Sequence, residues 1–235
     1  MMTTAEADKD DCQKPSRREM RRRAMLDAAN ALFLEKGYGA TSLTDIVKHS
    51  GGSLATLYEL FGGKEGLFRS IVEEGCAEFF SFLNDMDAGQ PSHDILRVVA
   101  QRFIEGVLAD DGAFLRLVIS EAGQFPEIGM AFYSAGPANA IRIIGNYLAG
   151  QSGRGTFEID DTEAAADTFI SMLLYDLQMR LLCRIPGKPT RRQIEKHVDH
   201  VVDTFLKLYA PSSHSTGPRQ APKAPGGSRK SRDVK

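Results

Sequence analysis

Residues 41–68 read TSLTDIVKHSGGSLATLYELFGGKEGLF, and the first part of this stretch has the pattern of a short helix. Leu43 and Ile46 are three residues apart, as residues on one face of a helix are. Ser42 precedes them, and serine is favoured at a helix N-terminus because its hydroxyl accepts a hydrogen bond from a free backbone amide. The pair Gly51-Gly52 then interrupts the pattern.

A second short helix follows directly. Ser53 is its expected N-cap, Leu57 and Phe61 share one face, and Gly62-Gly63 ends it. Two short helices joined by a glycine turn are typical of a helix-turn-helix, here over about residues 42–61. In that motif the second helix buries one face, and its other face is free to enter a DNA major groove about 12 Å wide.

The residues before this motif predict the platform on which it packs. Residues 17–36 carry apolar side chains at helical spacing, and Gly37 ends the pattern. The apolar positions are Met25, Ala28, Ala29, Leu32 and Phe33. A long amphipathic helix over about residues 64–86 is expected to follow. Residues 17–63 are therefore predicted to form a three-helix head, and spacing alone does not separate a DNA-binding helix-turn-helix from any other three-helix bundle.

Downstream of the head the sequence predicts further helices and shows no alternating strand pattern. The expected helices span 92–109, 112–123, 126–135, 137–149, 161–184 and 190–209. We therefore predict an all-α fold, with a helical body over residues 64–210. Residues 1–16 and the basic tail 211–235 contain few apolar side chains, so both are predicted to be disordered.

Charge is divided unevenly along the chain. Between Lys14 and Lys64 there are nine Lys or Arg against five Asp or Glu, whereas from Glu65 to Ala210 there are thirteen against twenty-one. After Pro211 the count is six against one. A basic head on an acidic body suits a protein that meets phosphates at one end, although an uneven distribution of solvated faces would look the same.

The composition excludes several other classes of protein. No apolar run is long enough for a transmembrane helix, and the polar, acidic first residues lack the apolar core of a secretory signal, so the cytoplasm is the expected compartment. Cys12, Cys76 and Cys183 are far apart and odd in number, which argues against a disulfide framework and a zinc site. A reactive thiol sensor stays open as an alternative.

The stretch quoted first resembles the signature of TetR-family transcriptional regulators, in which a Thr-led helix and a glycine turn precede L-Y-x-x-F-x-x-K-E-x-L. The matching positions are Thr41, Ile46, Gly51, Ser53, Leu57, Tyr58, Phe61, Lys64, Glu65 and Leu67, and upstream Ala29, Leu32, Phe33, Glu35, Lys36, Gly37 and Tyr38. The sequence departs from the commonest pattern at Gly52, Ala55 and Leu60. Residues 115–137 are similar to the effector domains of AefR/AcrR-like members.

The resemblance implies that the Tyr58 hydroxyl meets a DNA phosphate. Lys64 begins the next helix, where its ammonium and the free amides of the helix terminus can share one phosphate. Thr41 or Ser42, at the start of the first short helix, is expected to donate to a phosphate. Ser53, at the start of the second short helix, is also a candidate DNA-binding residue.

Base contacts are expected from the second short helix. Thr56 is the predicted base reader, through its hydroxyl or through its methyl group against thymine. Glu59 either accepts from a cytosine amino group or faces outward. Arg17, Arg18 and Arg21–Arg23 either add phosphate contacts or form a solvated helix start.

Two sets of residues are candidates for the body's functions. The predicted lining of an apolar effector cavity is Phe103, Phe125, Phe132, Met172 and Tyr175. Family members dimerise through two helices such as 161–184 and 190–209, which assigns dimerisation to Phe169, Leu173, Leu177, Val198, Val201 and Phe205. His197 and His200 lie beside Asp199 and Asp203, where a solvated or interface pair is favoured over a metal site.

These observations predict a homodimeric repressor that binds a pseudo-palindromic operator and releases it when a small, mostly apolar effector binds. An activator, or a repressor whose ligand strengthens DNA binding, is the alternative within regulation. An enzyme built in the helical body is the remote alternative, because the chain has no clustered nucleophile and base and no phosphate-binding glycine loop. No cofactor, membrane or metal is expected to take part.

Overall fold

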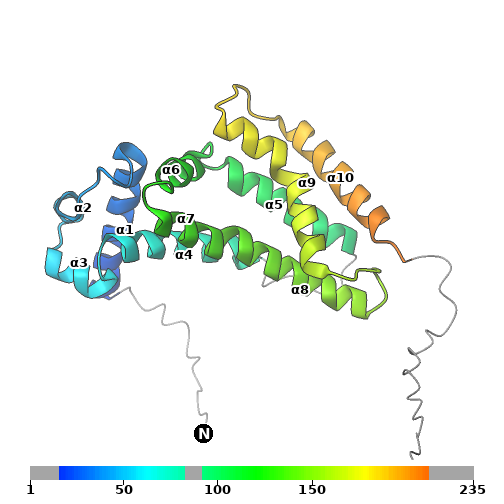
Figure 1. Cartoon of the computed structure of the whole chain (residues 1–235), viewed down its shortest axis with the longest axis horizontal. Helices are drawn as coiled ribbons and strands as arrows, with labels where there is room; N and C mark the ends of the chain where they lie inside the picture. The colour runs from blue at the N-terminus through cyan, green and yellow to red at the C-terminus, as the bar shows by residue number, and fades with distance from the viewer. Residues whose placement is uncertain (1–15, 83–91, 212–235) are drawn as a thin grey trace, which may run out of the picture.

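The computed structural model describes residues 16–82 and 92–211, and every regular element in them is a helix (Figure 1). The all-α prediction is therefore confirmed. The α-helices are α1 (Arg17–Lys36), α2 (Leu43–Ser50), α3 (Leu54–Phe61), α4 (Lys64–Phe80), α5 (Ser92–Leu108), α6 (Ala113–Glu121), α7 (Pro126–Tyr133), α8 (Asn139–Gly153), α9 (Thr162–Leu182) and α10 (Arg191–Leu208). The disorder predicted for residues 1–16 and 211–235 lies outside the described residues except at Ser16, which caps α1, and Pro211; the last residues of the helix predicted over 64–86 also lie outside them.

The helices predicted over 126–135 and 137–149 are continuous in the structure. A π-helical turn (Ser134–Ala138) joins α7 to α8, and Pro137 lies inside it. Proline has no backbone N–H to donate within a helix and its ring crowds the preceding turn, so a wider local winding accommodates it. The two helices predicted separately are therefore one continuous helical segment, with Pro137 inside it.

The head and the body share a hydrophobic core. The buried side chains of α1, α2 and α3 pack with Leu67, Phe68 and Val72 of α4, and also with Leu117 of α6 and Ile128 of α7. In Figure 1, α1–α3 form one end of the molecule, and α4 leads from them into the body. The hydrophobic core of the head predicted over residues 17–63 is therefore completed by side chains from α4, α6 and α7.

A second core holds the rest of the body together. It is formed by α5, α8, α9 and α10, with Phe80 at the end of α4. Phe205 of α10 packs against Phe169 of α9 with ring centres 5.1 Å apart. None of the described helices has an apolar stretch long enough to cross a membrane.

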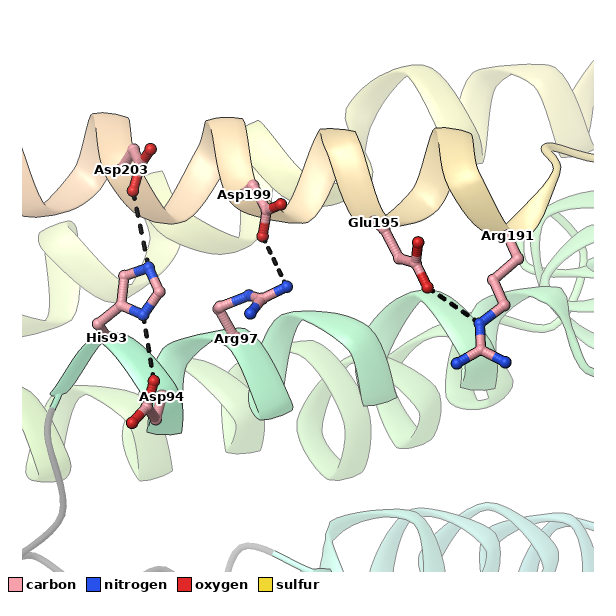
Figure 2. Close-up of polar contacts among 7 residues, drawn as sticks. All are labelled: His93, Asp94, Arg97, Arg191, Glu195, Asp199 and Asp203. Carbon is pink, nitrogen blue, oxygen red and sulfur yellow. Dashed lines mark hydrogen bonds and ion pairs between the residues drawn. The ribbon is translucent and has the colours of Figure 1, made fainter.

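Ion pairs on the surface align α10 with α5 (Figure 2). Arg97 lies 2.8 Å from Asp199, and His93 lies 3.7 Å from Asp203. The Nε2 atom of His197 lies 3.0 Å from the carbonyl oxygen of Leu173. Within the described ranges, no group of three or more His, Cys, Asp or Glu is placed to hold a metal ion, and both aspartates beside the histidine pair contact α5.

Candidate nucleic-acid interface

Serine caps begin both helices of the helix-turn-helix. The Ser42 hydroxyl accepts from the backbone amide of Asp45 at 3.1 Å and donates to the Asp45 carboxylate at 2.8 Å, and the second contact lowers the pKa of that carboxyl. The Ser53 hydroxyl accepts from the amide of Thr56 at 3.1 Å. Gly51, between the two helices, has φ 72°, a left-handed conformation that costs glycine little.

The α3 helix has one buried and one exposed face. Leu57 is fully buried and Phe61 nearly so, whereas the Tyr58 side chain is 55% exposed. Glu59 is exposed and Thr56 is partly exposed, and the Thr56 hydroxyl lies 2.9 Å from the Ser53 hydroxyl. The arrangement anchors α3 by one side and leaves the other accessible, as a helix that enters a DNA groove requires.

An ion pair connects α3 to the start of α1. The Arg18 guanidinium lies 3.4 Å from the Glu59 carboxylate, with both side chains largely exposed. This contact turns Glu59 towards α1 in the free protein and brings one member of the predicted basic cluster next to α3. Exposed pairs of this kind contribute only about 0–1 kcal/mol, so DNA can displace it at little cost.

Lys64 is the first residue of α4 and lies over the connection between α1 and α2. This connection, residues 37–42, is called the corner below. Its Nζ atom donates to the carbonyl oxygen of Gly39 at 3.2 Å and lies 4.5 Å from the centre of the Tyr38 ring. Partial burial lowers the pKa of Lys64, and the nearby Glu121 carboxylate opposes that effect. Gly63, the N-cap residue, offers no side chain to the first amides of α4, so these remain available to an anion.

Thr41 does not lie on this surface. Its side chain is 2% exposed, and its hydroxyl donates to the carbonyl oxygen of Gly37 at 2.8 Å. Sequence reasoning grouped it with Ser42 because both residues precede α2, but only Ser42 is exposed. The prediction that Thr41 meets a phosphate is corrected accordingly: the residue fixes the corner between α1 and α2 from inside.

The same corner is held from the body by α6 and α7. The Glu121 carboxylate accepts a hydrogen bond from the Gly39 amide at 3.0 Å, and the Phe125 ring packs edge-on against Tyr38 at 5.0 Å. Burial, with the charges of Glu127 and Glu65, raises the pKa of Tyr38 to about 12. Sequence reasoning missed Glu121, although an acidic residue at a helix C-terminus is unfavourable for the helix dipole and so indicates a compensating contact.

The residues predicted to line an effector cavity are not brought together. Phe103 is packed in the body core with its ring centre 5.4 Å from that of Phe79, and Met172 packs on the edge of this core. Phe125 and Phe132 are partly buried and pack against the core shared with the head, and Tyr175 is 71% exposed. The prediction of one cavity lined by these five side chains is therefore corrected, since helical spacing alone cannot tell which apolar faces meet.

The predicted dimerisation residues are mostly buried within their own chain. Phe169, Leu173, Val198, Val201 and Phe205 are each at most 3% exposed, and Leu177 is partly buried. The five buried side chains pack α9 against α10 and α5 and are corrected to core residues, whereas Leu177 packs at the edge of this core and its role in dimerisation stays a prediction.

The apolar side chains that α9 and α10 expose are different ones. Tyr175 is 71%, Met179 43% and Leu208 61% exposed. The sequence did not assign these side chains to the dimer interface. A helical period does not distinguish a face that is buried in the same chain from a face that a partner would cover.

Comparison with known proteins matches both parts of the chain to family models. Residues 25–71 match the model for bacterial regulatory proteins of the tetR family, and residues 94–211 match the C-terminal domain of AefR-like transcriptional repressors. The transcriptional repressor ComR of Escherichia coli is 35% identical over 106 residues, which are 44% of this chain and 46% of ComR. The chain thus matches less than half the length of that relative.

Solved structures match over most of the chain. A TetR-family regulator from Mesorhizobium loti superposes with a TM-score of 0.73 at 25% identity, covering 83% of this chain and all of that one. The flavonoid-responsive regulator FrrA superposes with a TM-score of 0.71 at 30% identity, covering 82% of this chain and 98% of that one.

Proposed function

Because the chain belongs to the TetR family of DNA-binding transcriptional regulators, we propose that it acts as a homodimeric repressor that releases its operator when a small molecule binds the body. Two relatives, ComR and BdcR of Escherichia coli, are transcriptional repressors. The observation that carries the proposal is the exposed face of α3 beside Lys64 at an uncapped helix start. Its site of action is the cytoplasm, beside chromosomal DNA.

The proposed DNA contacts divide into positioning and reading. Ser42, Ser53, Tyr58 and Lys64 contact phosphates, which fixes the position of α3 without carrying sequence information. Thr56 reads a base edge, and the α3 helix has no Arg or Lys for bidentate guanine recognition. Affinity therefore depends mainly on phosphate contacts and falls steeply with salt.

The proposed dimer interface is the exposed side of α9 and α10. Its centre is Tyr175 and Met179, large apolar side chains that a partner would remove from water. A two-fold dimer presents two α3 helices, and the operator would be pseudo-palindromic, with half-sites about one helical turn, roughly 34–36 Å, apart.

Release requires that the body change the spacing of the two heads. The contact that supports this step is the hydrogen bond between Glu121 of α6 and the Gly39 amide, since a shift of α6 would move the corner on which Lys64 rests. An effector shifts the equilibrium only as far as it prefers one head spacing over the other.

The experiment is selection of duplexes from a random pool by the purified full chain, followed by fluorescence anisotropy with the selected duplex at several salt concentrations. The proposal expects a pseudo-palindromic consensus, selective binding and a strong salt dependence. Binding that shows no sequence preference would contradict it. Transcription from a template carrying the selected site, with and without the chain, separates a repressor from an activator.

A further inference from the structure

A basic depression lies on the body, away from the nucleic-acid interface. It is formed by the turn between α5 and α6 and by the connection from α9 to α10, and has a volume of about 260 Å³. We propose that this depression, which we call the arginine pocket, binds a small amphipathic carboxylate. Its cationic residues are Arg116, Arg180, Arg184 and Lys188.

The charge of the arginine pocket is opposite to that of the body around it. Four of the thirteen Lys and Arg residues between Glu65 and Ala210 line this one depression, where Asp111 is the only acidic lining residue. The body as a whole carries eight more acidic than basic side chains over the same range. A local cationic site within an acidic surface attracts a small anion selectively.

Two of the four cations have acidic partners. Lys188 lies 2.6 Å from Asp111, and Arg180 lies 2.9 Å from Asp176. The Arg116 guanidinium is partly buried and donates only to backbone carbonyl oxygens, those of Asp111 at 2.6 Å and Leu181 at 2.9 Å.

Neither Arg116 nor Arg184 forms an ion pair within residues 16–82 and 92–211. Arginine binds a carboxylate through its planar guanidinium group, and two arginines without a carboxylate partner line this one depression.

Backbone strain gathers at the same place. Asp111, with φ 56°, and Arg184, with φ 53°, are the non-glycine residues with positive φ in the described part of the chain, and both line the arginine pocket. The left-handed conformation costs free energy for a residue with a side chain. Residues held in such strained conformations concentrate at functional sites. If Arg184 served only to end the helix, glycine would adopt the same backbone conformation at a lower free-energy cost. An arginine in this conformation therefore indicates a role for its side chain.

The walls of the depression are suited to an apolar tail. Leu181 and Ile185 line it, and the Ile185 side chain is 51% exposed. A second depression of about 460 Å³ shares the lining residues Leu177 and Pro189 and continues to Ile104 of α5. A carboxylate bound by the guanidinium groups would therefore have beside it a groove in which apolar side chains, among them Leu173, Leu177 and Ile194, can contact a chain or a ring, with Asp176, Gln193 and His197 also in its lining.

This inference does not rest on DNA binding, and its test uses the full chain without DNA. The probe is sodium octanoate, titrated calorimetrically, with octan-1-ol and sodium acetate as matched ligands that lack the charge or the chain. The proposal expects saturable octanoate binding and at least about tenfold weaker binding of octanol and acetate. No saturable binding of octanoate, or equal affinity for octanol, would overturn it.

The decisive variant is Arg184→Gly. Glycine accepts φ 53° readily, so the variant is expected to unfold at the same or a higher temperature while octanoate binds at least about tenfold more weakly. Arg102→Gln removes an exposed arginine of α5 outside the pocket and is expected to leave octanoate affinity unchanged. Wild-type affinity in Arg184→Gly would refute a ligand role for the guanidinium. If Arg102→Gln lost as much octanoate affinity as Arg184→Gly, the net charge of the protein would explain both losses. That result would refute the arginine pocket as the binding site.

Discussion

The side-chain nitrogen of Lys64 lies over the Tyr38 ring, 4.5 Å from its centre, and so rests on the corner that connects α1 to α2. Glu121 of the body holds the same corner through the Gly39 amide. One short turn of the chain therefore lies between the ammonium group of Lys64, at the start of α4, and the carboxylate of Glu121, at the end of α6.

Lys64→Ala is expected to weaken specific and non-specific duplexes about equally and to reduce the slope of log affinity against log salt by about one. The reason is the loss of a single phosphate contact at the start of α4. Anisotropy titrations at four salt concentrations measure both quantities, with Arg102→Ala on α5 as the control for net charge. An unchanged slope in Lys64→Ala would mean that α4 does not face the DNA backbone.

Thr56→Ala is expected to lose on the order of 1–3 kcal/mol of binding free energy on the selected duplex and little on others, because it removes a base contact. Thr56→Ser keeps the hydroxyl and Thr56→Val keeps the methyl, so the pair identifies which group reads the base. The α3 cap survives in all three, since it uses the Thr56 backbone amide. A uniform loss on every duplex would assign Thr56 to positioning.

Glu121→Ala is expected to accelerate hydrogen exchange of the Gly39 amide, which then loses its charged acceptor. Glu121→Gln retains a neutral acceptor and should fall between the variant and the wild type. Exchange measured by mass spectrometry on the peptide that contains Gly39 gives the answer. If Glu121→Ala left exchange unchanged, the link between α6 and the corner would be unimportant in solution.

Tyr175→Glu combined with Met179→Glu is expected to give a folded monomer, because both side chains are exposed in the single chain and charge would enter only a subunit interface. Sedimentation gives the mass, and circular dichroism reports folding. Val201→Glu is the contrasting variant: Val201 is 3% exposed, so an unpaired carboxylate there should unfold the chain itself. A double variant that remains dimeric would place the interface elsewhere.

Tyr38→Phe is expected to reduce the loss of stability at alkaline pH. The folded-state pKa of Tyr38 is about 12, above the value of 10.0 for a free tyrosine, so the neutral phenol is favoured by folding. That contribution is fully present below pH 10 and is lost as the pH rises towards 12. Urea unfolding at pH 8 to 11.5 measures it, and Tyr133→Phe, which alters a tyrosine that is 60% exposed, should follow the wild type.

The sequence was sufficient to predict the helices and the local order of the head. Ser42, Gly51, Ser53 and Gly62 act through backbone contacts within a few residues, so their roles can be inferred from neighbouring letters. The π-helical turn was not predictable in this way. A proline such as Pro137 is compatible both with the end of a helix and with a local π-helical turn inside a continuous one.

The functional surfaces of the body depend on distant contacts, and here prediction failed for a physical reason. Leu173 and Val201 look like interface residues in a helical pattern, but α5 covers them in the same chain. Tyr175 looks like a cavity residue and lies on the surface. Which of several apolar faces meet is settled by how the helices pack, and a single sequence does not encode that in any short-range pattern.

The core shared by the head and the body limits how this regulator can be re-engineered. Leu117 and Ile128 of α6 and α7 pack with the head residues, so a graft of residues 16–82 onto a foreign scaffold would leave Phe68 and its neighbours without their covering layer. A chimaera that is to keep this DNA specificity has to carry α6 and α7 with the head. The unit that recombination or design can exchange is therefore discontinuous in the chain.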